Sequence, residues 1–321
     1  MAALVSLDDV RAARERIDGR LHRTPVIGSR TLSERARATV VLKAELLQRT
    51  GAFKPRGVLN KLATLSDDEK RRGVISISAG NHAQALAYAA AVEQIDALVV
   101  MWETASPMKV VAAREYGATI DTSPPDIPAA FVRLDELIES TGRTLVHPYD
   151  DPLVMAGQGT VGLEVVEDVP GVDVVIVPVG GGGLVSGVAA AVKGAKPDAR
   201  VVAVEPELSA ALHESLKAGE PVTVEPRSIA DGMNGPYAGA NCVETCLALG
   251  VESLLVTEDD IVDAFRFMYS RTKLACEAAG AAPAAAVLSG KVELEPGSTV
   301  ALVVSGGNVA PETAAAILAP Q

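Results

Sequence analysis

A lysine between an aromatic residue and a proline is the first residue of this sequence that could do covalent chemistry. It lies in Thr50-Gly-Ala-Phe-Lys-Pro-Arg-Gly57, at the predicted start of a helix over residues 55–65. The start of a helix carries the positive end of the helix dipole, which disfavours a charged amine at that place. A neutral lysine amine is the nucleophile that Schiff-base chemistry requires. Lys54 is therefore a candidate catalytic residue, and a solvated surface lysine is the alternative.

Four consecutive glycines, Gly180 to Gly183, lie between a predicted strand and a helix that begins near Leu184. Glycine accepts a positive φ and lets backbone N–H groups approach an anion closely, so the run predicts a phosphate-binding loop. A tight strand-to-helix turn is the alternative. A dinucleotide-binding fingerprint fits poorly, because Val185 or Ser186 would stand at its third glycine. Glu205, at the end of the next strand, nevertheless has the spacing of a ribose-binding carboxylate.

Two more strand ends combine glycine with polar side chains. Ser78-Ala-Gly-Asn-His82 follows one predicted strand and starts a helix, and Ser305-Gly-Gly-Asn308 follows the last predicted strand. The first forms an anion-binding helix N-terminus suited to a substrate carboxylate, with simple capping by Ser78 or Asn81 as the alternative. Ligands of open α/β sheets collect at the carboxyl ends of the strands. We therefore expect the lysine segment and the three strand ends to face one cleft.

The elements that must position these residues indicate an α/β fold. Short β-branched runs alternate with alanine-rich helical stretches, which favours parallel strands with crossover helices on both faces. Strands are predicted at 39–43, 74–78, 97–101, 119–122, 144–147, 174–179, 201–204 and 300–304, and further helices at 83–92, 107–116 and 261–273. No linker divides the chain, so a second domain is expected to be nested in the first.

The four motifs, in this order along the chain, resemble the fold type II pyridoxal phosphate enzymes, and within them the threonine/serine dehydratase and serine racemase group. The similarity extends to His147-Pro-Tyr-Asp-Asp-Pro152, Ala156-Gly-Gln-Gly-Thr160 and Ile229-Ala-Asp-Gly232. The resemblance implies two open, twisted, mainly parallel sheets with flanking helices. It also implies a large cofactor-binding domain of residues 1–69 and 148–321, with a nested small domain of residues 70–147.

The resemblance also assigns roles to individual residues. Lys54 would form the Schiff-base link to the cofactor and remove the substrate α-proton. The other cofactor contacts would be Phe53 on the pyridine ring, Asn81 on the ring hydroxyl, Gly180, Gly181, Gly182, Gly183 and Leu184 on the phosphate, and Ser305 on the pyridine nitrogen. The substrate carboxylate would lie among Ser78, Ala79, Asn81 and His82.

The expected reaction is elimination of water from a β-hydroxy amino acid, giving a 2-oxo acid and ammonia. L-threonine and L-serine are the expected substrates, and a modified substrate such as 3-hydroxyaspartate, phenylserine or a hydroxyectoine-derived compound is the alternative. Similar serine racemases carry a serine where Ala79 stands, and its hydroxyl acts as acid and base on the ring face opposite the lysine. With alanine at this position, proton transfer is expected on one face of the cofactor ring only. No second carboxylate follows Glu205 in Leu208-Ser-Ala-Ala211, so no metal is expected. The regulatory extension of the biosynthetic threonine dehydratases is not expected either.

The amino-acid composition excludes some classes of protein. A formal charge of −12 excludes a basic nucleic-acid surface, and the apolar runs are too short for a membrane span. The N-terminus does not resemble a signal peptide, so a cytoplasmic enzyme is expected, acting as a homodimer or homotetramer. Cys242, Cys246 and Cys276 are interpreted as buried thiols, with a metal or redox role as the alternative. A nucleotide-binding α/β protein without pyridoxal phosphate is the hypothesis from a different class.

Overall fold

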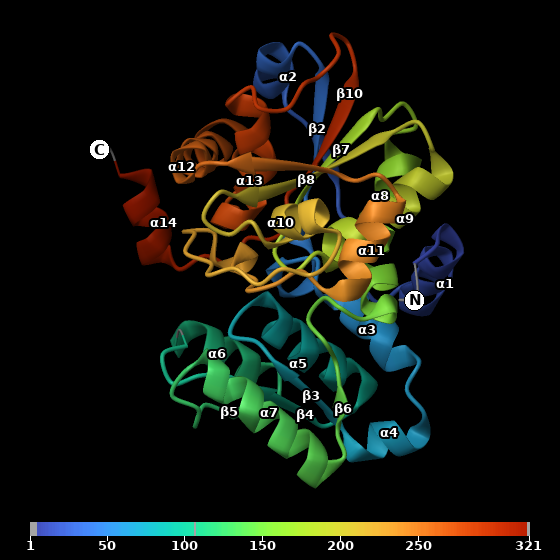
Figure 1. The fold of residues 1–321 in the computed structure, drawn as a ribbon, viewed down its shortest axis with the longest axis vertical. Coiled ribbons are helices and arrows are strands. Elements are labelled where there is room, and N and C mark those ends of the chain that lie inside the picture. Colours follow the sequence, from blue (N-terminus) through green and yellow to red (C-terminus); the bar gives the residue numbers. More distant parts are fainter. Residues whose placement is uncertain (1–4, 106, 320–321) are drawn as a thin grey trace.

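The computed structural model describes residues 5–105 and 107–319 and has two sheets with their helices packed around them (Figure 1). Residues 1–4 lie outside the described part of the chain. They begin the N-terminal segment that was not expected to be a signal peptide. None of the described helices is both long and apolar enough to cross a membrane.

The larger sheet has the strand order β1-β2-β10-β7-β8-β9, in which only the β1–β2 pair is antiparallel. Its strands are β1 (Val26–Gly28), β2 (Thr39–Lys43), β7 (Val174–Pro178), β8 (Arg200–Pro206), β9 (Glu252–Val256) and β10 (Thr299–Val303). The smaller sheet is wholly parallel in the order β5-β4-β3-β6. Its strands are β3 (Val74–Ile77), β4 (Ala97–Val100), β5 (Thr119–Asp121) and β6 (Thr144–Leu145). The predicted α/β class with two mainly parallel sheets is confirmed.

Helices follow nearly every strand. They are α1 (Leu7–Ile17), α2 (Arg30–Ala36), α3 (Pro55–Ala63), α4 (Asp67–Arg72), α5 (Asn81–Glu93), α6 (Pro107–Glu115), α7 (Ile127–Thr141), α8 (Pro152–Asp168), α9 (Gly183–Ala195), α10 (Ala211–Ala218), α11 (Ala240–Ala248), α12 (Glu258–Phe267), α13 (Ala278–Leu288) and α14 (Pro311–Leu318). Short helical turns are η1 (Glu45–Leu47), η2 (Arg49–Gly51), η3 (Asp231–Met233) and η4 (Met268–Thr272).

The large sheet is covered on both faces, as its apolar strands predict. Alternate residues of a strand point to opposite faces, so Ile176 and Val202 pack with α12 and α13, whereas Val175 and Ala203 pack with α9. Residues 74–145 build the smaller sheet, and the segments on either side build the larger one. The domain boundaries at 69/70 and 147/148 stay a prediction.

Several elements differ from those predicted, and helices such as α1, α7 and α8 lie outside the predicted ranges. Strands β1 and β9 were not expected, because β1 has three residues and β9 is a half-exposed edge strand without a long apolar run. The helix predicted to end at Lys273 ends at Phe267 and continues as a π-helical turn, after which Lys273 takes a φ of +61°.

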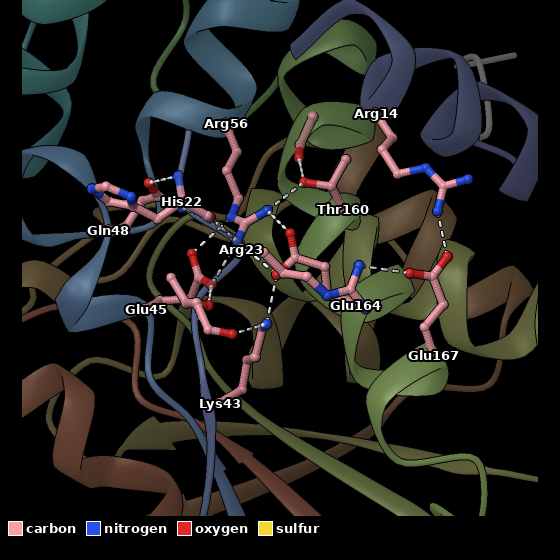
Figure 2. Close-up of polar contacts among 12 residues, drawn as sticks. Arg14, His22, Arg23, Lys43, Glu45, Gln48, Arg56, Thr160, Glu164 and Glu167 are labelled. Carbon is pink, nitrogen blue, oxygen red and sulfur yellow. Dashed lines mark hydrogen bonds and ion pairs between the residues drawn. The ribbon is translucent and has the colours of Figure 1, made fainter. Parts of the chain in front are cut away.

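A buried ionic cluster anchors α3, the helix that begins directly after Lys54. The Arg56 guanidinium is 1% exposed and donates to the carboxylates of both Glu45 and Glu164 (Figure 2). Lys43 of β2 donates to the same Glu164 carboxylate on α8. Burial would lower the pKa of Arg56, but the two carboxylates raise it above its usual value. The cluster ties α3 to β2 and α8 and so fixes the position of the candidate lysine.

Candidate active site

One cavity of about 790 Å³ collects the four predicted segments. It is lined from the carboxyl ends of β3 and β7, from the segment after β10 and from the start of α3. Every predicted site residue lines it: Phe53, Lys54, Ser78, Ala79, Asn81, His82, Gly180, Gly181, Gly182, Gly183, Leu184 and Ser305. The expectation of one shared cleft is therefore confirmed, while the role of each residue stays a prediction.

Lys54 is the N-cap residue of α3, as predicted, and its side chain lies in the cavity wall. Its Nζ donates to the carbonyl of Pro148 at 2.7 Å and lies 5.2 Å from the centre of the Phe53 ring. Burial lowers the pKa of Lys54 to about 8, although Cys242 and Glu277 act in the opposite direction. Desolvation is thus the main cause of the shift, and about a tenth of this amine is neutral at pH 7, far more than for a lysine with the usual pKa.

The glycine run forms the turn into α9 and leaves the start of that helix without a side-chain cap. Each glycine also has a packing reason, which the sequence did not show. A Cβ at Gly181 would lie 2.4 Å from the ring of Tyr149, and one at Gly183 would lie 2.7 Å from the Tyr149 carbonyl oxygen. Gly182 has a φ of +97°, which favours glycine. The loop is both closely packed and open to an anion at its N–H groups.

The second helix N-terminus, at α5, is also open. Gly80 is its N-cap residue and no side chain caps the helix, so capping by Ser78 or Asn81 is not observed. The Ser78 hydroxyl instead accepts a hydrogen bond from the backbone N–H of Gly80 at 3.1 Å. Backbone N–H groups of the first turn therefore remain available for a carboxylate.

The imidazole of His82 makes its hydrogen bonds inside the protein. The Ser76 hydroxyl donates to the carbonyl of Val146, so His82 Nε2, 3.0 Å from both, must act as a donor. Burial, followed by the charge of Lys54, lowers the pKa of His82 to about 3, and its Nδ1 has no hydrogen-bond partner among the described residues. The ring is neutral and offers the cavity no donor, so only the backbone N–H of His82 suits a carboxylate.

Ser305 reaches the site through pairing between two distant segments. Ala52 forms an isolated bridge with Gly306, and the backbone N–H of Phe53 donates to the carbonyl of Ser305 at 3.1 Å. The only hydrogen bond of Ser305 to a side chain or backbone group of the described residues is this one to its carbonyl, so its hydroxyl is free. A side chain that is 4% exposed yet lines the cavity with a free hydroxyl suits a ring nitrogen.

Sequence reasoning missed Glu277, which lines the same cavity and is 5% exposed. Its carboxylate accepts a hydrogen bond from the Asn81 side-chain amide at 2.8 Å. The available signal was a single acidic residue directly before the apolar helix α13, which by itself resembles an ordinary helix start. Tyr149 lies in one of the motifs that carry the family resemblance, but its contact with the glycine run could not be predicted from the sequence.

The alternatives for Glu205 and the cysteines receive no support from the geometry. Glu205 is fully buried outside the cavity, and its carboxylate accepts the backbone N–H groups of Leu212 and His213 at the start of α10. Cys242 and Cys246 are buried free thiols on α11. Among residues 5–105 and 107–319, no group of three or more His, Cys, Asp and Glu side chains could hold a metal ion.

The cavity fits pyridoxal phosphate in the chemistry of its wall. It combines an amine with a lowered pKa, an uncapped glycine-rich helix start, a free buried hydroxyl and an aromatic ring. A phosphate, an aldehyde and a pyridine nitrogen need these partners.

Comparison with known proteins agrees with this fit. The family model described as "Pyridoxal-phosphate dependent enzyme" matches residues 17–306. The chain is 41% identical to the catabolic L-threonine dehydratase TdcB of Escherichia coli over 308 residues, which cover 95% of this chain and 93% of that protein.

Two solved structures are also similar. Maize serine racemase superimposes with a TM-score of 0.93 at 36% identity, covering 97% of this chain and 96% of that one. The threonine deaminase from T.th. gives a TM-score of 0.89 at 41% identity, covering 95% of this chain and 99% of that one. The predicted resemblance to fold type II enzymes is confirmed, and this chain belongs to the family of pyridoxal-phosphate dependent enzymes.

Proposed function

We propose that this enzyme eliminates water from L-threonine and L-serine and releases the corresponding 2-oxo acid and ammonia. The observation that carries the proposal is the Lys54 amine, whose pKa burial lowers to about 8 in one cavity with the glycine run. The similar proteins of E. coli and T.th., named as a threonine dehydratase and a threonine deaminase, support this choice of substrate.

The cofactor would be held mainly by segments that adjoin the larger sheet. Backbone N–H groups at Gly180 to Gly183 and Leu184 would bind the phosphate, Phe53 would pack on the ring, and the Ser305 hydroxyl would meet the ring nitrogen. When bound, pyridoxal phosphate supplies an electron sink for the bonds at the substrate α-carbon. A neutral serine at the ring nitrogen leaves that sink weaker than a carboxylate partner would, which favours prompt loss of a β-hydroxyl.

Lys54 would move the α-proton. An amine with a pKa of about 8 is close to the value at which a general base is effective near neutral pH. Its contact with the Pro148 carbonyl orients the Nζ lone pair and hydrogens within the cavity.

The substrate carboxylate would lie at the start of α5. Backbone N–H groups of Asn81 and His82 are not used by a side-chain cap, and the Ser78 hydroxyl lies beside them. This contact would orient the α-carbon toward Lys54.

Ala79 would limit proton transfer to one face of the cofactor ring. It lines the cavity, and its methyl group can neither donate nor accept a proton. We therefore propose elimination from one enantiomer, L, without interconversion of L- and D-serine.

A panel of β-hydroxy amino acids tests the proposal. The purified holoenzyme is incubated with L-threonine, L-serine, D-serine, 3-hydroxyaspartate and phenylserine, and 2-oxo acid and ammonia are measured. Equal release of both products, fastest with L-threonine or L-serine, is expected. Preference for a modified substrate would overturn the substrate choice, and no release from any compound would overturn the reaction.

The oligomeric state and the location of the enzyme are the last part of the proposal. We propose a homodimer or homotetramer that works in the cytoplasm, as the sequence led us to expect. Light scattering on the purified protein, coupled to gel filtration, gives the mass that tests the assembly.

A further inference from the structure

A chain of hydrogen bonds crosses from the segment after β10 to the first turn of α5. The side-chain nitrogen of Asn308 donates to the carbonyl of Thr50 at 2.7 Å and to Oδ1 of Asn81 at 2.8 Å. Nδ2 of Asn81 in turn donates to Oε1 of Glu277 at 2.8 Å. Thr50, Asn308 and Glu277 belong to the part of the chain that builds the larger sheet, whereas Asn81 follows β3 of the smaller one.

This chain fixes which way the Asn81 amide faces. A backbone carbonyl can only accept, so Asn308 must present its nitrogen to Thr50 and therefore also to Asn81. Asn81 Oδ1 is then occupied, and its Nδ2 donates to Glu277, whose ionised carboxylate can only accept hydrogen bonds. The second proton of Asn81 Nδ2 has no partner among the described residues.

Two glycines make room for these contacts. A Cβ at Gly306 would lie 2.4 Å from Glu277 Oε1, and one at Gly51 would lie 2.5 Å from Asn308 Oδ1. Real Cβ atoms do not approach other atoms so closely, so both contacts depend on glycine at these positions. The arrangement is therefore built into the backbone of the two loops around Lys54.

We propose that Glu277 is a positioning residue that holds the Asn81 amide with an N–H, and not an oxygen, toward the ring hydroxyl oxygen of the cofactor. The proposal rests on the proposed function, since it needs a cofactor ring beside Lys54. A hydrogen bond to an ionised carboxylate is about twice as strong as a neutral one, so Glu277 can enforce this orientation.

Glu277 also lies among charges that suggest a rival role. Burial, followed by the charge of Asp231, raises the pKa of Glu277 to about 7, against the Asn81 hydrogen bond and the charges of Lys109 and Lys54. Asp231 lies on η3, Lys109 on α6 and Lys54 at the start of α3. Glu277 could thus act directly on Lys54 as a countercharge, without Asn81. The test must separate these two roles.

A double-mutant cycle separates them through cofactor binding. The dissociation constant of pyridoxal phosphate and the absorption spectrum of the bound cofactor are measured for the wild type, Glu277→Gln, Asn81→Ala and the double variant. Glu277→Gln is expected to weaken binding about 5- to 10-fold and to reduce the yellow band when Asn81 is present. In the Asn81→Ala background it should change neither quantity. A Glu277→Gln effect of equal size in both backgrounds would overturn the proposal and favour a direct charge effect on Lys54.

Controls keep the outcome interpretable. Glu205→Gln alters another buried carboxylate, which lies outside the cavity, and should leave the dissociation constant and spectrum unchanged. If thermal unfolding shows that Asn81→Ala does not fold, Asn81→Ser replaces it, because it also removes the amide that Glu277 contacts, and the Glu277→Gln effect should again be lost in that background. A wild type that binds no pyridoxal phosphate would contradict the proposed function itself. Normal binding with additive effects would contradict only the role of Glu277.

Discussion

Gly182→Ala is the substitution that most directly probes how the glycine run is built. Gly182 has a φ of +97°, and a Cβ there would lie 2.7 Å from the Cβ of Cys242. Gly117 supplies a matched control, because its φ is +99° and a Cβ there would meet nothing within 4 Å. The two variants share the backbone strain and differ in the close contact.

The magnitude follows from these two terms. An L-residue in the left-handed region costs about 1–2 kcal/mol, and overpacking a buried contact costs about 1–3 kcal/mol more. Gly182→Ala should therefore lower the free energy of unfolding by about 2–5 kcal/mol, and Gly117→Ala by about 1–2 kcal/mol. The loss of unfolded-state entropy on replacing glycine by alanine is common to both variants and cancels in the comparison.

Urea unfolding of the apoprotein measures the stabilities, and titration with pyridoxal phosphate measures the affinities. Gly182→Ala should also weaken cofactor binding at least about tenfold, since the N–H groups of the loop move with the new methyl group. Gly117→Ala should bind the cofactor as the wild type does. Equal stability losses together with wild-type affinity in Gly182→Ala would refute both the close packing and the phosphate role of this loop.

Three other substitutions have distinct expected outcomes. Lys54→Ala should fold and lose at least about 100-fold of its turnover, because the general base is gone, and turnover above a tenth of wild type would contradict its assignment. Ala79→Ser should introduce slow serine racemisation, detected by chiral chromatography, whereas substantial racemisation by the wild type would show that another group serves the second face. Arg56→Met should lower the free energy of unfolding by about 3–5 kcal/mol in urea, because Glu45 loses its charged partner in the interior, and a loss below about 1 kcal/mol would contradict that reasoning.

The fold and most of the site could be predicted because local signals agree with the tertiary structure. Each site segment combines glycine or a reactive side chain with an apolar strand or a helix start, and parallel topology then brings the strand ends together. The strand at Thr39–Lys43 was predicted to the residue. By contrast β1 and β9 lie at the sheet edges, where few apolar side chains are buried, so their pattern was too weak to predict.

The parts that could not be predicted depend on contacts between distant segments. Glu277 contacts Asn81 across 196 residues of sequence, and only the fold brings the two together. The fit of the Tyr149 ring against Gly181 is likewise a tertiary contact, so the sequence showed no packing reason for the glycine run. The hydrogen bonds of the His82 imidazole could not be predicted either, because its partner Val146 lies on the segment after β6.

Covalent trapping of the cofactor on Lys54 tests the central claim most directly. The purified protein is reduced with borohydride and digested, and the peptide that carries the pyridoxyl group is identified by mass spectrometry. A yellow protein that bleaches on reduction, with the label on Lys54 alone, is the predicted result. A colourless protein, or a label on another lysine with Lys54 unmodified, would contradict the assignment of this cavity as a pyridoxal phosphate site.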